Sequence, residues 1–181
     1  VPHVWTTGAF GSGVYAFDGA KLAGAIGQIT NSNSQGELYL TDVIEILKSS
    51  GESIAAILLD DFTEILGVND RIQLADSAAL LRDRINERWM REGVNIIDPT
   101  TSWIYATATI SSDVTLHPGS AILGRTTIAA GAVIGPRTTL TDCVVKEGAS
   151  ILESIATDTE FGEGATVGPF TYLRSGTVLG D

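Results

Sequence analysis

Few side chains in this sequence could carry out chemistry. It contains two histidines, His3 and His117, and a single cysteine, Cys143. A catalytic serine or cysteine needs a histidine that accepts its proton, and no Ser/His/Asp or Cys/His set is spaced for that role here. We therefore expect His117, in Leu-His-Pro-Gly, to form a corner of the chain, and Cys143 to be a small buried hydrophobic residue. No role is assigned to His3.

Two other segments could be considered for phosphate binding. Arg174 lies in Tyr-Leu-Arg-Ser-Gly, and a planar guanidinium can hold a phosphate through two parallel hydrogen bonds, which a lysine cannot. Taken alone, a solvated arginine on a protein face is the default interpretation. The glycine-rich stretch Gly8–Gly13 lacks the Lys-Ser/Thr pair and the following helix of a phosphate-binding P-loop. Arg174 is therefore the stronger candidate, with both interpretations open.

The elements that would position Arg174 follow from a repeat. From Ile104 onward an aliphatic or aromatic residue recurs about every six positions, with a slip near Val145, and a small or β-branched residue follows most of them four positions later. A coil with three flat faces has this period, because each hexapeptide makes one short strand and one corner. The sequence therefore predicts a parallel β-helix. The large residues of the repeat are expected inside it: Ile104, Ile110, Leu116, Ile122, Ile128, Ile134, Leu140, Val145, Ile151, Phe161, Val167, Leu173 and Leu179. The small ones, which are expected to fit the turn regions, are Ala108, Val114, Ser120, Thr126, Ala132, Thr138, Val144, Ala149, Ala165, Thr171 and Thr177.

The residues before the repeat have a different pattern. Asp18 and Thr41 are expected to cap two short helices, because their side-chain oxygens can accept hydrogen bonds from the first turn. Two apolar runs have the length of buried strands. The expected elements are a strand at 13–17, a helix at 18–29, a helix at 42–49 that ends before Gly51, and a strand at 54–59. This alternation is typical of an α/β domain.

A long helical pattern separates the two regions. Between Asp70 and about Glu92 apolar residues recur at spacings of three and four, and Gly93 is the expected stop. We interpret this helix as an interdomain linker rather than as part of a core. The predicted organisation is an α/β remnant at 1–71, a linker helix at 72–92, and a β-helix at 93–181.

Composition limits the classes of function. The formal net charge of -11 argues against nucleic acid or an anionic membrane as a partner, although one local arginine can still bind an anionic small molecule. One cysteine permits no internal disulfide, and no apolar run reaches the roughly 20 residues that span a bilayer. The amino terminus has no signal-peptide pattern. The missing initiator Met predicts an internal fragment of a longer protein, as does the lack of capping elements at both ends of the β-helix other than the linker helix.

Four segments carry a resemblance to a known family: Asn33–Asp42, Gly67–Arg71, Asp98–Trp103 and Gly168–Gly176. In order and spacing they closely resemble the bacterial bifunctional UDP-N-acetylglucosamine pyrophosphorylase / glucosamine-1-phosphate N-acetyltransferase, in a form like that of actinobacteria. The resemblance covers nearly the whole chain from about Gly13 onward. Residues 1–12 do not resemble the matching part of the family.

The resemblance implies two activities on one cytoplasmic chain. A left-handed β-helix transfers acetyl from acetyl-CoA to glucosamine 1-phosphate. The end of a Rossmann-like nucleotidyltransferase domain then belongs to the second activity, which joins N-acetylglucosamine 1-phosphate to UTP with the help of Mg²⁺ and releases pyrophosphate. The product feeds peptidoglycan and lipopolysaccharide synthesis. The family works as a homotrimer through its β-helix.

The resemblance also assigns roles to residues. Tyr39 and Thr41 match positions that line the sugar pocket of the nucleotidyltransferase, and Asn69 matches an oxygen ligand of Mg²⁺. Without the resemblance, Asn69 and Thr41 are better explained as helix caps and Tyr39 as a packed aromatic. Arg174 matches an arginine that holds the phosphorylated sugar during acetyl transfer. Ser175 replaces a proline that is usual in the family, which is expected to loosen the local backbone.

Other functional parts of the family are missing. The nucleotide-binding Gly-rich loop has no counterpart, Gly11 stands where the family has a sugar-contacting asparagine, and the catalytic histidine of the acetyltransferase is expected beyond Asp181. The chain alone is therefore expected to be inactive or nearly so. Two alternatives stay open. One is another hexapeptide-repeat sugar acyltransferase, and the other is a β-helix trimerisation scaffold without activity.

Overall fold

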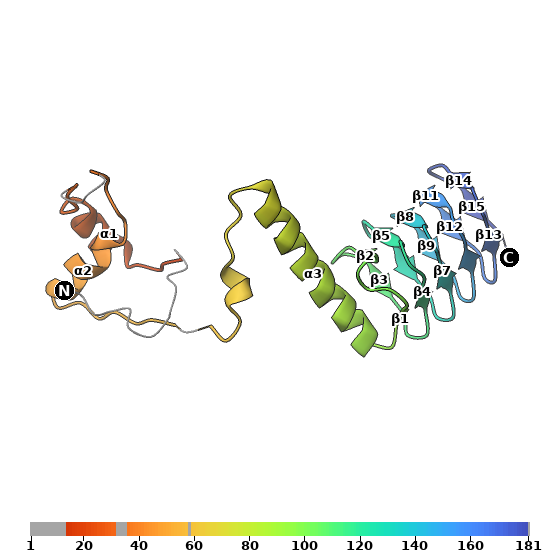
Figure 1. The fold of residues 1–181 in the computed structure, drawn as a ribbon, viewed down its shortest axis with the longest axis horizontal. Coiled ribbons are helices and arrows are strands. Elements are labelled where there is room, and N and C mark those ends of the chain that lie inside the picture. The colour runs from red at the N-terminus through yellow and green to blue at the C-terminus, as the bar shows by residue number, and fades with distance from the viewer. Residues whose placement is uncertain (1–13, 32–35, 58, 181) are drawn as a thin grey trace. The chain divides into compact units, whose positions relative to one another are not determined.

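The computed structural model describes residues 14–31, 36–57 and 59–180, and all structural statements concern these residues. The chain divides into two compact units, Val1–Gly67 and Val68–Asp181, each of which is described by itself. The second unit consists of one long helix and a stack of short strands (Figure 1). Within the described residues, no helix is both long and apolar enough to cross a membrane.

The second unit forms a coil of parallel sheets, as the six-residue repeat predicted. Each strand pairs in parallel with the strand three places later, which gives three five-stranded sheets with the orders β1-β4-β7-β10-β13, β14-β11-β8-β5-β2 and β15-β12-β9-β6-β3. This arrangement agrees with the left-handed parallel β-helix that the resemblance implies. The strands are β1 Asn95–Ile96, β2 Trp103–Ile104, β3 Thr109–Ile110, β4 Thr115–Leu116, β5 Ala121–Leu123, β6 Thr127–Ile128, β7 Val133–Ile134, β8 Thr139–Thr141, β9 Val144–Val145, β10 Ser150–Ile151, β11 Ile155–Thr157, β12 Glu160–Phe161, β13 Thr166–Val167, β14 Tyr172–Leu173 and β15 Val178–Leu179.

The interior of the coil is filled by the predicted aliphatic residues. In the sheet around β8, Ile122 is in register with Leu140, and Leu140 with Ala156. All three are completely buried, while the residue before each of them faces outward. The side chains of neighbouring coils therefore stack on one another, and each coil removes apolar surface of the previous one from water. The repeat analysis missed Ala156 because it left out the unit between Ile151 and Phe161.

One small position of the repeat was predicted wrongly. Val144 was expected among the small residues that fit the turn regions, but it begins β9, and 45 % of its surface is exposed. The one-residue slip of the repeat places Cys143 inside instead, where it is completely buried. The prediction that Cys143 is a small buried hydrophobic residue is therefore confirmed. Burial raises the pKa of its thiol, which disfavours the nucleophilic thiolate.

The long helix α3, Arg71–Arg91, agrees with the predicted span. Its first turn is capped by Asp70, whose Oδ1 accepts a hydrogen bond from the amide of Gln73 at 2.7 Å. The amide of Asn69 in turn donates to Oε1 of Gln73 at 2.7 Å. The alternative in which Asn69 caps this helix is therefore wrong, since Asp70 occupies the capping position.

The second half of α3 belongs to the core of the β-helix. Trp89 is 6 % exposed and joins the cluster that includes Val94 and Ile96 at the first coil. α3 also contacts β1 and β2. The prediction of a linker outside any core is therefore wrong for this half of the helix. The physical reason is that the first coil has no preceding coil to cover its apolar interior, and Trp89 supplies that cover.

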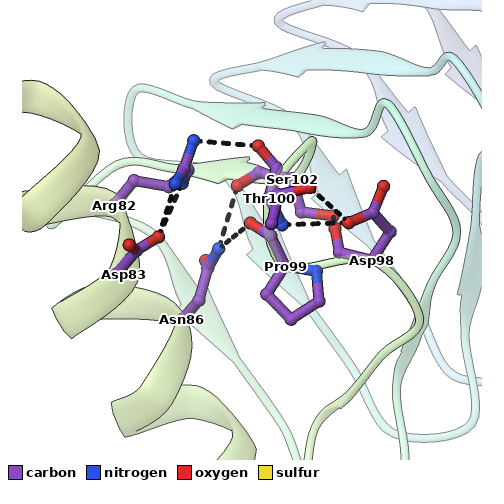
Figure 2. A network of polar contacts seen from close by, with 7 residues as sticks. All are labelled: Arg82, Asp83, Asn86, Asp98, Pro99, Thr100 and Ser102. Atoms are coloured by element: carbon purple, nitrogen blue, oxygen red, sulfur yellow. Dashed lines mark hydrogen bonds and ion pairs between the residues drawn. The ribbon is translucent and has the colours of Figure 1, made fainter. Parts of the chain in front are cut away.

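Polar contacts fix α3 to the loop before β2 (Figure 2). Asn86 is completely buried, and its Nδ2 donates to the carbonyl of Pro99 at 2.8 Å and to that of Ser102 at 3.0 Å. Arg82 donates from Nη1 to the carbonyl of Thr100 at 2.9 Å. The guanidinium of Arg82 also lies over the ring of Trp103, 5.2 Å from its centroid, a distance typical of a cation–π contact. These contacts fix the direction in which the chain enters the coil.

The loop itself is ordered by Asp98. Its Oδ1 accepts hydrogen bonds from the amide and the hydroxyl of Thr100, at 3.0 and 2.6 Å, and its Oδ2 accepts one from the hydroxyl of Thr101 at 2.8 Å (Figure 2 shows the Thr100 contact). Hydrogen bonds to the charged form favour it, so the hydroxyls of Thr100 and Thr101 lower the pKa of Asp98. Thr101 also connects the loop to the next coil, because its Oγ1 accepts a hydrogen bond from the amide of Gly119 at 3.0 Å.

The first unit contains the two predicted helices and a short 3₁₀ helix. They are α1 Gly19–Ile26, α2 Asp42–Ser49 and η1 Phe62–Ile65. Asp18 caps α1 as predicted, because its Oδ1 accepts hydrogen bonds from the amides of Ala20 and Lys21. α1 ends earlier than expected. Thr41 precedes α2, but its side chain makes no capping hydrogen bond, so that part of the prediction is wrong.

Among the described residues, neither of the two strands predicted for the first unit is present. Residues 14–17, 52–57 and 59 have no strand assignment. An extended segment becomes a strand only where a neighbouring segment pairs with its amides and carbonyls. Ile57 is 88 % exposed and Ile54 is 45 % exposed, so within the described residues nothing packs over this apolar run. The described residues of the first unit therefore contain helices but no sheet, and the α/β remnant stays a prediction. Gly8–Gly13 and His3 lie outside the described residues.

Candidate functional site

Arg174 lies on the outer surface of the last described coil. It directly follows β14, where Tyr172 faces outward and Leu173 packs against the interior cluster. Because residues two apart on a strand share a face, Tyr172 and Arg174 both face outward. Tyr172 is 65 % exposed and Arg174 is exposed as well. Among the described residues, no side chain pairs with the guanidinium of Arg174. It is therefore available for an anion.

A tight turn presents Arg174. Its carbonyl accepts hydrogen bonds from the amide of Thr177 at 3.2 Å and from the hydroxyl of the same residue at 2.6 Å. Gly176, in the third position of the turn, has a φ of 81°, whereas Ser175 in the second position is outside the positive-φ region. These features define a type II turn, in which glycine is favoured at the third position because it tolerates positive φ.

Ser175 contacts the preceding coil, and the loosening expected from its replacement of a proline stays a prediction. Its hydroxyl donates a hydrogen bond to Oδ2 of Asp158, one coil earlier. Asp158 is a residue that the sequence analysis missed. It lies at a corner of the coil, 17 residues before Ser175, which is about one turn of the coil.

The segment that leads to Arg174 begins where two coils pack closely against each other. Gly168 has a φ of 108°, and a Cβ at this position would lie 1.9 Å from the carbonyl oxygen of Leu152. Only glycine fits there, since the contact is with backbone that cannot rotate away. The Gly-Pro-Phe-Thr-Tyr-Leu-Arg segment is therefore held tightly against the preceding coil at its first residue.

Arg174 follows the end strand of a sheet whose outer face is partly apolar. The register aligns Trp103, Ala121, Thr139, Ile155 and Tyr172 in one outward-facing row across β2, β5, β8, β11 and β14. Within this row Trp103 is 43 % exposed and Ile155 is 49 % exposed. Exposed apolar rows of this kind mark surfaces that associate with other molecules.

The residues expected at the nucleotidyltransferase site are divided between the two units. Tyr39 and Thr41 lie at the start of α2 in the first unit, where Tyr39 is half-buried and Thr41 is exposed. The hollow beside α2 is lined by residues such as Asp42, Glu45 and Ser49, and neither Tyr39 nor Thr41 lines it. Their assignment to a sugar pocket stays a prediction.

Asn69 does not form a magnesium site by itself. It is exposed and belongs to the second unit, immediately before α3. In the part of the chain that the structure describes, no group of three or more His, Cys, Asp and Glu side chains could hold a metal ion. One neutral amide oxygen does not hold Mg²⁺, which prefers carboxylates. The described residues therefore do not fit this ion.

His117 has the structural role that was predicted. Its amide donates to the carbonyl of Ile134 at 2.8 Å, and its own carbonyl accepts from the hydroxyl of Ser120 at 2.7 Å. Both contacts belong to the backbone ladder and the corner of the coil.

The parallel three-sheet coil with its hexapeptide period defines a β-helix protein of the hexapeptide-repeat class. The sequence is 52% identical over 169 residues to the "Bifunctional protein GlmU" of Rhodococcus opacus (strain B4), and the match covers 93% of this chain and 34% of that protein. The chain belongs to the bifunctional GlmU family. It spans about a third of the length of the curated relatives it matches.

Other relatives give the same result. The GlmU protein of Paenarthrobacter aurescens (strain TC1) is 49% identical over 170 residues, with 94% of this chain and 34% of that protein covered. That of Mycobacterium bovis (strain BCG / Pasteur 1173P2) is 48% identical over 169 residues, with 93% and 34% covered. No protein-family model matches the chain. Among solved structures, a mutant of perosamine N-acetyltransferase from Caulobacter crescentus, in complex with CoA and GDP-perosamine, has a TM-score of 0.33 at 20% identity over 76% of each chain.

Proposed function

We propose that this chain contributes Arg174 to the binding of glucosamine 1-phosphate, in a reaction that transfers acetyl from acetyl-CoA to the amine of the sugar. One observation carries the proposal. Arg174 is exposed on the outer surface of the β-helix, and its guanidinium is not paired with any of the described side chains. A guanidinium matches a phosphate through two parallel charge-assisted hydrogen bonds.

In this reaction the amine nitrogen attacks the thioester carbonyl of acetyl-CoA. The carbon–sulfur bond breaks, CoA leaves as its thiol, and the amine gives up a proton. A phosphate held by Arg174 fixes the sugar at its anomeric end, so that the orientation of the amine is set before the attack. The contribution of this chain is therefore to bind and orient the acceptor substrate.

The second activity of the longer protein concerns residues 1–71. It joins N-acetylglucosamine 1-phosphate to UTP and releases pyrophosphate, with Tyr39 and Thr41 as sugar contacts and Asn69 as a ligand of Mg²⁺. We assign residues 1–71 to this uridyl transfer and residues 93–181 to acetyl transfer, with the linker helix at 72–92 between them. Because the described residues alone do not fit Mg²⁺, a carboxylate ligand from outside them would be needed beside Asn69. A uridyl-transfer assay on the isolated chain is expected to give no product, and product formation would contradict this division.

A binding measurement tests the role of Arg174. In NMR titrations of the 181-residue chain with glucosamine 1-phosphate, R174A is expected to weaken binding at least about tenfold, because a charge-assisted pair with phosphate is lost. R174K keeps the charge but not the planar fork, so its affinity is expected to fall between those of R174A and the natural chain.

The matched control is R125A. Arg125 is also an exposed arginine at a corner of the coil, so R125A removes the same charge elsewhere on the β-helix. Its effect on affinity is expected to stay within about twofold, as for a screened distant charge. Equal affinities for R174A and R125A, or no binding by the natural chain, would contradict the proposal.

Association of copies is a second candidate function, which the apolar row of Trp103, Ile155 and Tyr172 favours. We propose that this row lies in the interface of a homotrimer, so that the chain acts as a β-helix scaffold even without activity. Light scattering is expected to give three times the 19.0 kDa mass of one copy. A monomer at all concentrations would exclude the scaffold.

A further inference from the structure

The turn that presents Arg174 is fixed to the preceding coil by one residue, Asp158. The hydroxyl of Ser175 donates to Oδ2 of Asp158, and the amide of Gly176 donates to the backbone carbonyl of Asp158 at 2.8 Å. The two residues that follow Arg174 are therefore both hydrogen-bonded to the same corner residue. The amide of Asp158 donates to the carbonyl of Thr141 at 2.9 Å, which connects this corner to the coil before it.

The geometry of the turn explains why the hydroxyl contact matters. Ser175 occupies the second position of a type II turn, where proline is favoured because its ring fixes φ near the required value. A serine has no such restriction, and the amide of Ser175 makes no hydrogen bond within the described residues. Its side-chain bond to Asp158 is therefore the contact that holds this position.

The corner one coil earlier uses its aspartate differently. Asp142 also has a positive φ, of 54°, but its Oδ1 accepts from the backbone amide of Arg125, in the coil before it. Asp158, with a φ of 45°, instead directs its carboxylate to a side chain in the coil after it. The contact between Asp158 and Ser175 is thus not a general requirement of this corner. It is specific to the turn that presents Arg174.

We propose that Asp158 and Ser175 are positioning residues for Arg174, which they hold in its phosphate-binding orientation. The inference rests on the proposed function, because it concerns how the same phosphate-binding residue is held in place. Binding is weakened in proportion to the fraction of time that a site spends in other conformations. Because the turn is hydrogen-bonded to the preceding coil, the backbone of Arg174 keeps one conformation before the sugar phosphate binds.

The test uses three variants of the 181-residue chain. S175A removes the hydroxyl. D158G removes the carboxylate without backbone strain, because glycine tolerates positive φ. S175P fixes φ through the proline ring instead of through the hydrogen bond to Asp158. It removes no backbone hydrogen bond, because the amide of Ser175 makes none within the described residues. D113G is the matched control, since Asp113 also lies at a corner with a positive φ, of 62°, and is exposed.

Two readouts are measured on each variant: hydrogen exchange of the Gly176 amide, which needs no ligand, and the affinity for glucosamine 1-phosphate by NMR titration. S175A and D158G are each expected to speed the exchange and to weaken the binding, both by roughly fivefold. S175P is expected to restore both to near the values of the natural chain. D113G is expected to change neither.

The outcomes separate this inference from the proposed function. Unchanged Gly176 exchange in S175A and D158G would overturn the positioning role. Faster exchange with unchanged affinity would also overturn it, provided that R174A lowers the affinity. If R174A leaves the affinity unchanged, the phosphate-binding function itself is wrong, and the inference fails with it even where the exchange data agree. Rescue by S175P distinguishes positioning from a direct contact of the hydroxyl with the ligand, because proline has no hydroxyl.

Discussion

The fold of the second unit depends on the stacking of each coil on the next. An interior residue such as Leu140 is completely buried only because Ile122 and Ala156 lie in register above and below it. The strands are two or three residues long and have no stability of their own, so the ladder of hydrogen bonds and the interior stack must form together. The first coil has no coil before it. α3 takes that place through Trp89, and the buried Asn86 satisfies the carbonyls of the loop that leads into β2.

The geometry of the candidate site depends on the same stacking of coils. Arg174 is exposed, yet its turn is held by Asp158 in the coil below, and the segment that leads to it begins at Gly168, where only glycine fits against the carbonyl of Leu152. The preceding coil therefore acts as the template for the binding residue. Proteins commonly carry a binding group on a rigid scaffold, because the conformational entropy of the group is then lost on folding and not on binding.

The sequence predicted the β-helix because the same physical requirement repeats every six residues, and the error at Val144 came from a slip that only the register resolves. The predicted strand at 54–59 failed for the opposite reason, since a strand needs a partner that an apolar run does not reveal. Within the site, Arg174 could be found from its motif. The contact of Ser175 with Asp158 could not, because residues 17 positions apart meet only when the length of each coil is known.

The central claim is that α3 is the first layer of the β-helix, and the free energy of unfolding of N86A tests it most directly. Urea unfolding followed by tryptophan fluorescence should show a loss of about 2–4 kcal/mol for N86A, because two buried carbonyls lose their donor and a small cavity forms. D76A, on the exposed first half of the same helix, should change the free energy by less than about 0.5 kcal/mol. Equally small losses in both variants would mean that α3 merely connects two domains, and would contradict the account.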